Sequence, residues 1–295
     1  MDLVNLLQGS PVAFVSTVAL FALLVGSFLN VVIHRLPIML DREWQAHCEE
    51  LFPQHGKPAG ATGEQQPFNL VRPRSRCPHC GHLIGALENI PILSYLMLRG
   101  RCRHCGASIS VRYPVVEAAS ALGAVIVAMH FGFTPAALAA LLLTWALLIL
   151  TAIDLDTQLL PDAITQPFLW LGLTLSLFGV FTDSHSSIIG ALAGYLSLWS
   201  VYIVFKLVTG KEGMGHGDFK LLALLGAWLG WQTLPLIIIL SAVVGAVVGV
   251  TLVALKHHQS GHPIPFGPYL AGAGWIALLW GQDITDAYLR FAGLA

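Results

Sequence analysis

The residues of this sequence best suited to do chemistry are two aspartates beside long apolar segments. Asp218 ends a glycine-rich turn, Gly213-Met-Gly-His-Gly-Asp-Phe-Lys, between two apolar runs, and Asp154 follows another apolar run 64 residues earlier. Two carboxylates held close cannot both ionise readily, so one keeps a proton near neutral pH. The ionised member can then activate water while the protonated member polarises a peptide carbonyl. We therefore predict that Asp154 and Asp218 form a catalytic pair for peptide hydrolysis.

Each aspartate also has a structural alternative. A carboxylate at a helix C-terminus opposes the helix dipole, so Asp154 is poorly placed as a cap. Asp218 is in the right place to be an N-cap for a helix beginning near Phe219. A cap does not need three glycines in five residues, however. We expect Gly215 and Gly217 to form an active-site turn whose backbone bends tightly and approaches a substrate chain closely.

Three further acidic residues are weaker candidates for an auxiliary role. Asp162 is expected to cap the following helix, residues 163–181. Asp156 has no clear helical role, so it either assists the pair or is simply solvated. Glu117 lies just inside an apolar helix, where an ionisable side chain suggests function. The structural alternative for Glu117 is an ion pair with Arg112.

The composition predicts a membrane protein. The chain has 295 residues, of which 56% are hydrophobic and only 11% are charged, whereas about 25% charged residues is typical of soluble domains. Apolar runs long enough to span a bilayer recur, and such runs form helices because hydrocarbon offers the backbone no partner. We predict an all-α polytopic membrane protein with about eight transmembrane helices. These cover about residues 11–33, 117–131, 135–153, 163–181, 188–208, 219–231, 235–255 and 266–280.

Several local signals refine this helix assignment. Small residues at Gly26-Ser27 and Gly190-x-x-x-Gly194 permit close helix contact. Asn30 is expected to hydrogen-bond to a neighbouring helix, and Pro37 is expected to end the first helix. Residues 41–66 are polar and are expected to form a loosely ordered insertion. The run 219–231 is short, so it is predicted to be tilted, re-entrant or continuous with its neighbour.

Four of the five cysteines form two Cys-x-x-Cys pairs, Cys77 with Cys80 and Cys102 with Cys105, each followed by glycine. Two such pairs supply four thiolates to one tetrahedral ion, which is typical of a structural zinc site of the zinc-ribbon kind. The 21 residues between the pairs are slightly more than usual. A redox dithiol and unligated cysteines are the alternatives, and Cys48 is interpreted as an incidental thiol. Three histidines are competing ligands: His79, His82 and His104.

The distribution of charge predicts orientation. Seven of the ten arginines lie between Arg72 and Arg112 around the cysteines, without the aromatic platforms of a single-strand binder, so no nucleic-acid partner is expected. Arg35 and Arg112 flank this loop, and positive residues mark the cytoplasmic side. The N-terminus is therefore predicted to lie outside, with the cysteine loop and both aspartates facing the cytoplasm.

The ordered set of motifs resembles the GxGD intramembrane aspartyl proteases and, among them, the type IV prepilin peptidases. The resemblance rests on Gly-x-Gly-Asp at residues 215–218 and on the Asp154 segment at residues 153–162. It extends to residues 26–37, the tetracysteine loop, Arg112-Tyr113-Pro114 and the Pro263–Pro268 bend. It covers nearly the whole chain. Gly-x-Gly-Asp alone is a weak signal, but the ordered set is specific.

The resemblance implies a bifunctional enzyme of the bacterial inner membrane. Such enzymes cut the basic leader from prepilins and type II secretion pseudopilins after a glycine, then methylate the new N-terminal residue, usually Phe, with S-adenosyl-L-methionine. It implies that Asp154 and Asp218 are catalytic and that zinc and Gly100 belong to the methyltransferase function. Glu117 and Asp156 are candidates to meet the basic leader. Membrane lipid is an expected partner, and a homodimer is left open.

This interpretation divides the chain into three parts, and three alternative functions compete with it. Residues 1–37 form the first transmembrane helix, 38–112 a cytoplasmic loop with the zinc site, and 113–295 the peptidase core. One rival is a GxGD peptidase without methylation, which the complete cysteine loop disfavours. A transporter with intramembrane carboxylates would show inverted repeats, which are not seen. A zinc-dependent binding scaffold would tolerate Asp→Asn changes at both aspartates.

Overall fold

The computed structural model of this chain describes residues 3–51, 68–85, 87–255 and 264–293. These residues form helices and two isolated β-bridges, with no strand among them, which confirms the all-α prediction. They fall into two compact units: Val15–Val125, and Met1–Phe14 together with Ile126–Ala295. The second unit contains both aspartates and no cysteine. The predicted catalytic pair and the predicted metal site therefore belong to different units.

The first long helix, α2 (Pro11–Leu51), is longer than predicted. It continues through Pro37, so the expectation that Pro37 ends the helix is wrong. The expectation of a loosely ordered insertion is also wrong for residues 41–51, because they are helical. Residues 52–66 of that segment lie outside the described residues. A proline inside a helix removes one backbone hydrogen bond. The residues after Pro37 include Met39, Leu40 and Ala46, which are good helix formers that favour continuation.

Within the Val15–Val125 unit, α2 packs closely against α4 (Arg112–Phe131). A Cβ atom on Gly26 would lie 2.8 Å from Cα of Glu117, so only glycine permits this approach. The Ser120 hydroxyl donates to the carbonyl of Ala22 at 2.7 Å. The Asn30 amide donates to the carbonyl of Tyr113 at 3.1 Å, as predicted for a polar residue between helices. A short 3-10 turn η1 (Leu87–Asn89) and helix α3 (Leu93–Met97) complete the helices of this unit.

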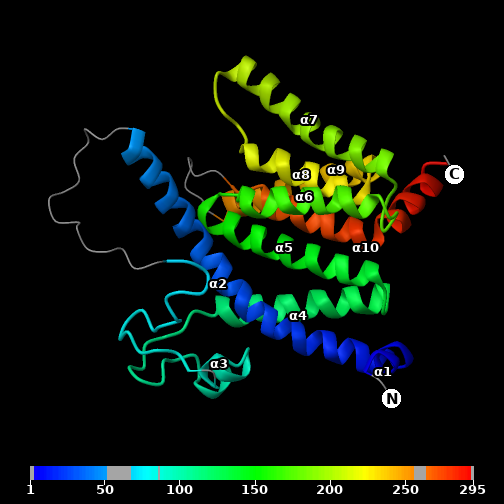
Figure 1. The fold of residues 1–295 in the computed structure, drawn as a ribbon. Coiled ribbons are helices and arrows are strands. Elements are labelled where there is room, and N and C mark those ends of the chain that lie inside the picture. The colour runs from blue at the N-terminus through cyan, green and yellow to red at the C-terminus, as the bar shows by residue number, and fades with distance from the viewer. Residues whose placement is uncertain (1–2, 52–67, 86, 256–263, 294–295) are drawn as a thin grey trace. The chain divides into compact units, whose positions relative to one another are not determined.

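The second unit is a bundle in which α8 is central. Helix α8 contacts α6, α7 and α10, and α10 also contacts α5 and α9; Figure 1 shows α8 alongside α6 and α7. Phe219, Leu222 and Trp228 of α8 are almost completely buried, as expected of a helix surrounded by others. The bounds are α1 (Leu3–Gly9), α5 (Pro135–Thr157), α6 (Asp162–Ser176), α7 (Ser184–Thr209), α8 (His216–Leu229), η2 (Trp231–Thr233), α9 (Leu234–Ala254) and α10 (Gly267–Phe291).

Helices α7 and α8 meet through glycines, which confirms the small-residue contact predicted for Gly190 and Gly194. Gly190 and Gly226 face each other with no room for a Cβ atom on either. A Cβ atom on Gly194 would lie 2.6 Å from the Leu222 carbonyl oxygen and 3.1 Å from Cα of Ala223. Both neighbours are backbone atoms, which cannot move aside as a flexible side chain can.

We expect Gly194→Ala to destabilise the protein by about 1–3 kcal/mol, the usual cost of overpacking. The measurement is the thermal unfolding midpoint in detergent. Gly272→Ala is the matched control, because it also lies in a helix but has no atom within 4 Å of its added Cβ. It should be neutral or stabilising by about 0.5–1 kcal/mol, since alanine favours helix over glycine. Equal midpoints for the two variants would contradict this packing account.

By length and composition, five helices of the described residues are able to cross a membrane. The predicted count of about eight is not confirmed. Helices α6 and α8 have 15 and 14 residues and are too short for a full span. Gly230, with φ of 83°, ends α8 before the 3-10 turn, so α8 is not continuous with α9. The five candidates are Pro11–Leu51, Arg112–Phe131, Pro135–Thr157, Ser184–Thr209 and Trp231–Ala254.

Candidate active site and metal site

Asp154 lies in the last turn of α5. This helix starts at an N-cap, Thr134, whose hydroxyl accepts the N–H of Ala137, and it ends at Gln158 in the left-handed conformation. The Asp154 side chain faces the helix bundle, and the residue is only 5% exposed. Its Oδ2 atom accepts the backbone N–H of Gly267 at 3.1 Å. Asp154 is therefore a buried carboxylate held by a backbone donor 113 residues away.

Asp218 lies in the first turn of α8 and is 7% exposed. The alternative of a simple N-cap is wrong, because α8 begins at His216 and its N-cap is Gly215. Asp218 is thus the third helical residue, and its side chain is directed into the bundle. Leu160 lies against both Gly217, the residue before Asp218, and Gly267, the donor to Asp154. The fold therefore brings together the two carboxylates that the sequence predicts to be a pair.

The glycine-rich turn before Asp218 is held against α7 and the loop after α5. Gly213 lies over the Phe205 ring, where an added Cβ would be 2.6 Å from a ring carbon. Glu212 accepts hydrogen bonds from Lys206 at 2.8 Å and from the Tyr202 hydroxyl at 3.2 Å. Gly217 packs on Leu160, because a Cβ atom added at position 217 would lie only 2.8 Å from Cβ of Leu160. These contacts orient the turn that presents Asp218.

The weaker aspartate candidates lie outside the buried pair. Asp156 is exposed, because two residues along a helix place it on the face opposite Asp154. Asp162 does not cap α6 as expected, since the N-cap is Pro161 and no side chain caps the helix. Instead both Asp162 oxygens accept from Lys220 Nζ at 2.7 Å. This ion pair joins the start of α6 to the N-terminal part of α8.

Glu117 has a structural position in the Val15–Val125 unit. It is buried, and its carboxylate accepts the backbone N–H of Ile92 at 2.8 Å and a hydrogen bond from the Ser27 side chain. Ile92 has φ of 59°, a left-handed conformation that side chains rarely adopt. The Glu117 carboxylate therefore joins α4 to α2 and fixes the backbone that enters α3.

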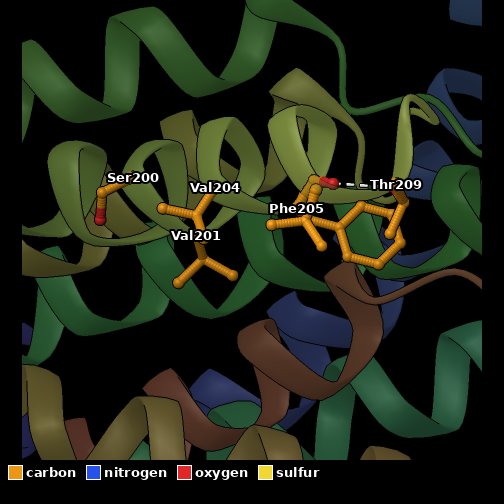
Figure 2. A pocket seen from close by; sticks show the side chains of 6 residues that line it. Ser200, Val201, Val204, Phe205 and Thr209 are labelled. Carbon is orange, nitrogen blue, oxygen red and sulfur yellow. Dashed lines mark hydrogen bonds between the residues drawn. The ribbon is translucent and has the colours of Figure 1, made fainter.

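A hollow lies along α7, and Figure 2 shows it at close range. Its lining comes from a single helix. Its two hydroxyl groups are already used within that helix: Ser200 donates to the carbonyl of Ser197 and Thr209 donates to that of Phe205. The rest of the lining is apolar, so the hollow has the character of a membrane-facing helix surface. The lining residues are Ser200, Val201, Val204, Phe205, Val208 and Thr209.

The two cysteine pairs form two knuckles with the same hydrogen bonds. In each, the N–H of the first glycine after the pair donates to the carbonyl of the first cysteine: Gly81 to Cys77 and Gly106 to Cys102, both at 2.9 Å. Both glycines have positive φ, 71° and 72°. An antiparallel bridge closes each knuckle. The bridges are Arg76 with Leu83 and Arg101 with Ser108.

The four cysteine sulfurs form a group that is able to hold a metal ion. All four lie within 4.8 Å of one another, and among the described residues no histidine joins this cluster. His82 and His104 instead stack with ring centroids 4.9 Å apart. Backbone N–H groups of Cys80 and His79 lower the pKa of the Cys77 thiol to about 7, which favours the thiolate that metals bind.

Gly100 lies between the two knuckles in a tight backbone position. It has φ of 66°, and an added Cβ would be 2.9 Å from the Tyr95 hydroxyl oxygen. Arg99 just before it also has positive φ, at 51°. Non-glycine residues in this conformation are uncommon and concentrate at functional sites. The predicted auxiliary residue Gly100 is therefore a position that requires glycine.

Sequence reasoning missed three residues around the aspartates: Leu160, Lys220 and Gly267. Lys220 follows Asp218 by two residues, so its nearness to the site was visible, but its partner Asp162 was not. Leu160 was part of the Asp154 motif without an assigned contact. Gly267 lies within a proline-rich bend, which gives no sequence signal for a contact with Asp154. None of these contacts follows from helical spacing, because each joins distant segments.

These features define a class of protein: a membrane protein of many helices with a buried carboxylate pair and a tetracysteine cluster. Residues 20–131 match the family model described as the bacterial peptidase A24 N-terminal domain. Residues 141–250, which contain both aspartates, match the model of the type IV leader peptidase family. The chain belongs to the type IV leader peptidase family.

Curated relatives match this chain over nearly its whole length. The prepilin leader peptidase/N-methyltransferase of Stutzerimonas stutzeri is 58% identical over 100% of both chains. That of Pseudomonas aeruginosa is 58% identical over 99% of both chains. That of Aeromonas hydrophila is 59% identical over 97% of this chain and 98% of the relative. No solved structure matches the chain.

Proposed function

We propose that this chain is a bifunctional prepilin leader peptidase and N-methyltransferase. It cleaves the basic leader of type IV prepilins and pseudopilins after a glycine, then methylates the new N-terminal residue, usually Phe. The observation that carries the peptidase part is the buried pair Asp154 and Asp218 within the matched family region. The full-length similarity to relatives that carry both activities in their names supports the methyltransferase part.

The carboxylate pair accounts for hydrolysis without a covalent intermediate. One aspartate is ionised and takes a proton from water as the water oxygen attacks the scissile carbonyl carbon. The other donates its proton to the carbonyl oxygen, giving a neutral tetrahedral diol. Collapse of the diol breaks the C–N bond, and a proton passes to the leaving amine. Burial of both carboxylates keeps bulk water from competing with this exchange.

The tetracysteine cluster fits a structural zinc ion. Zn–S bonds of about 2.3 Å in a tetrahedron place sulfurs about 3.8 Å apart. The Cys77 and Cys105 sulfurs are 3.8 Å apart. Four thiolates would close the coordination shell, so the metal would stabilise the loop that contains Gly100. S-adenosyl-L-methionine would supply the methyl group to the free amine of the cleaved substrate.

The predicted location is the bacterial inner membrane, with the site toward the cytoplasm and the N-terminus in the periplasm. A cytoplasmic site suits a substrate whose basic leader stays in the cytoplasm. Arg112 at the start of α4 and Arg35 just after the apolar run at residues 11–33 support this orientation. The division of the chain at residues 37 and 112, contact with specific lipids and a homodimer also stay predictions.

The test uses purified protein in detergent with a peptide made of a basic leader, glycine, phenylalanine and an apolar helix. We expect mass spectrometry to show loss of the leader without added cofactor. With S-adenosyl-L-methionine present, the mature product should gain one methyl group on its N-terminal amine. Cleavage that never leads to methylation would reduce the proposal to a peptidase. An uncut substrate would contradict it altogether.

A further inference from the structure

The turn that begins α10 contacts Asp154 but has no role in the hydrolysis steps described above. Within it, the first-turn N–H groups of α10 need acceptors, because a helix supplies none for them. Tyr269 and Leu270 donate to the carbonyl of Phe266 at 3.1 and 3.2 Å. Pro268 has no N–H. The Gly267 N–H is the remaining donor of this turn, and it donates to Asp154 Oδ2 at 3.1 Å.

Position 267 accommodates the Asp154 carboxylate only because it is glycine. A Cβ atom there would lie 2.6 Å from Asp154 Oδ2 and 3.2 Å from Leu160 Cδ2. The first distance is shorter than real Cβ atoms tolerate. Asp154 is itself only 5% exposed, so its carboxylate would have to move within the helix bundle. Any larger residue would therefore displace the carboxylate, the start of α10, or both.

Leu160 links this contact to the other aspartate. Its side chain lies against position 267 and also against position 217, where an added Cβ would be 3.2 Å from Leu160 Cδ1. Gly217 immediately precedes Asp218 in α8. One leucine side chain thus separates the backbone that holds Asp154 from the backbone that carries Asp218. The spacing between the two carboxylates depends on both glycines.

We propose that Gly267 is a positioning residue of the peptidase site. Its N–H holds one oxygen of Asp154 and leaves the other oxygen for water, and its missing side chain keeps the carboxylate near Asp218. This inference rests on the proposed function, because positioning matters only if the two aspartates cleave peptide bonds. It adds the start of α10 to the elements that build the site.

The kinetic test is Gly267→Ala, with Gly272→Ala in the same helix as the matched control. We expect Gly267→Ala to lower kcat for leader cleavage by about 100-fold, because small misplacements of catalytic groups have effects of this size. KM should change little, and the unfolding midpoint should show that the protein folds. Gly272→Ala has no atom near its added Cβ and should cleave like the wild type.

A second variant separates the two neighbours of position 267. Gly267→Ala combined with Leu160→Ala removes the leucine contact but keeps the contact with Asp154. We expect kcat to stay low in this double variant. Recovery of the rate would mean that crowding of Leu160 was the cause, and would overturn the proposal. Wild-type kcat in Gly267→Ala, with Asp154→Asn inactive, would also overturn it while leaving the proposed function intact.

A spectroscopic test needs no substitution at Gly267, so it applies even if Gly267→Ala fails to fold. The chain has three Phe-Gly peptide bonds, at Gly132, Gly179 and Gly267. Labelling Phe carbonyl carbon with ¹³C and Gly nitrogen with ¹⁵N selects these three amides by NMR. Gly132 and Gly179 donate to the carbonyls of Ala128 and Ser176 and serve as internal controls.

In Asp154→Ala, we expect one of the three Phe-Gly amide protons to move upfield and exchange faster with water, because it loses a charged acceptor. The other two should stay in place. If no amide responds, or if all three respond alike, the hydrogen bond from Gly267 to Asp154 is not formed in solution and the proposal fails. A peptidase assay on the wild type, run separately, tests the proposed function by itself.

Discussion

Asp154→Asn and Asp218→Asn are each expected to lower kcat for leader cleavage by about 10³-fold or more. A positioned proton-transfer group contributes about 10²–10⁴-fold, and here each carboxylate has an indispensable share of the exchange. Asparagine keeps the size and the hydrogen-bonding oxygen of aspartate, so the Gly267 N–H keeps an acceptor in Asp154→Asn. The measurement is single-turnover cleavage of a prepilin-type peptide in detergent, with the unfolding midpoint recorded for each variant.

The controls for this prediction distinguish chemistry from loss of charge. Asp283→Asn removes an exposed carboxylate of α10 and should cleave at the wild-type rate. The double variant Asp154→Asn with Asp218→Asn should be no slower than either single variant, because residues that act as a unit are not additive. The wild-type rate should be bell-shaped in pH, since one carboxylate must be ionised and the other protonated. Normal cleavage by either single variant would sink the aspartyl mechanism.

Cys77→Ser is expected to remove the bound metal and to abolish methylation while leader cleavage continues. Loss of even an outer-shell partner lowers metal affinity about 10–100-fold, so loss of a direct ligand should lower it further. Cleavage should survive because the cysteines belong to the Val15–Val125 unit and the aspartates to the other unit. The measurements are zinc content by mass spectrometry and transfer of labelled methyl groups to a pre-cleaved peptide.

Cys48→Ser is the matched control for the metal prediction. Cys48 is an exposed thiol in α2 and lies outside the cluster of four sulfurs. Its replacement should change neither zinc content nor methylation. Treating the wild type with a chelator should reproduce the Cys77→Ser result, and added zinc should restore methylation to the wild type only. A variant that loses zinc yet methylates normally would show that the metal has no part in this activity.

The sequence alone determined the features that depend on local pattern. Apolar runs predicted helices because the bilayer leaves the backbone no other partner. The Cys-x-x-Cys-Gly pattern predicted the knuckles because each closes within six residues, as Cys77 N–H to the His82 carbonyl shows. Gly190 and Gly194 predicted close packing because i,i+4 spacing places both on one helix face. The pairing of Asp154 with Asp218 was inferred from chemistry, since no local pattern encodes their distance.

Tertiary structure decided what depends on long-range contacts. Asp162 was expected to cap α6, but Lys220, 58 residues away, binds it instead. Helix α2 continues past Pro37, although proline is locally unfavourable there. Gly267 reaches Asp154 across 113 residues. Helical periodicity states which face a residue occupies but not which segment covers that face, so these partners emerge only when the helices pack.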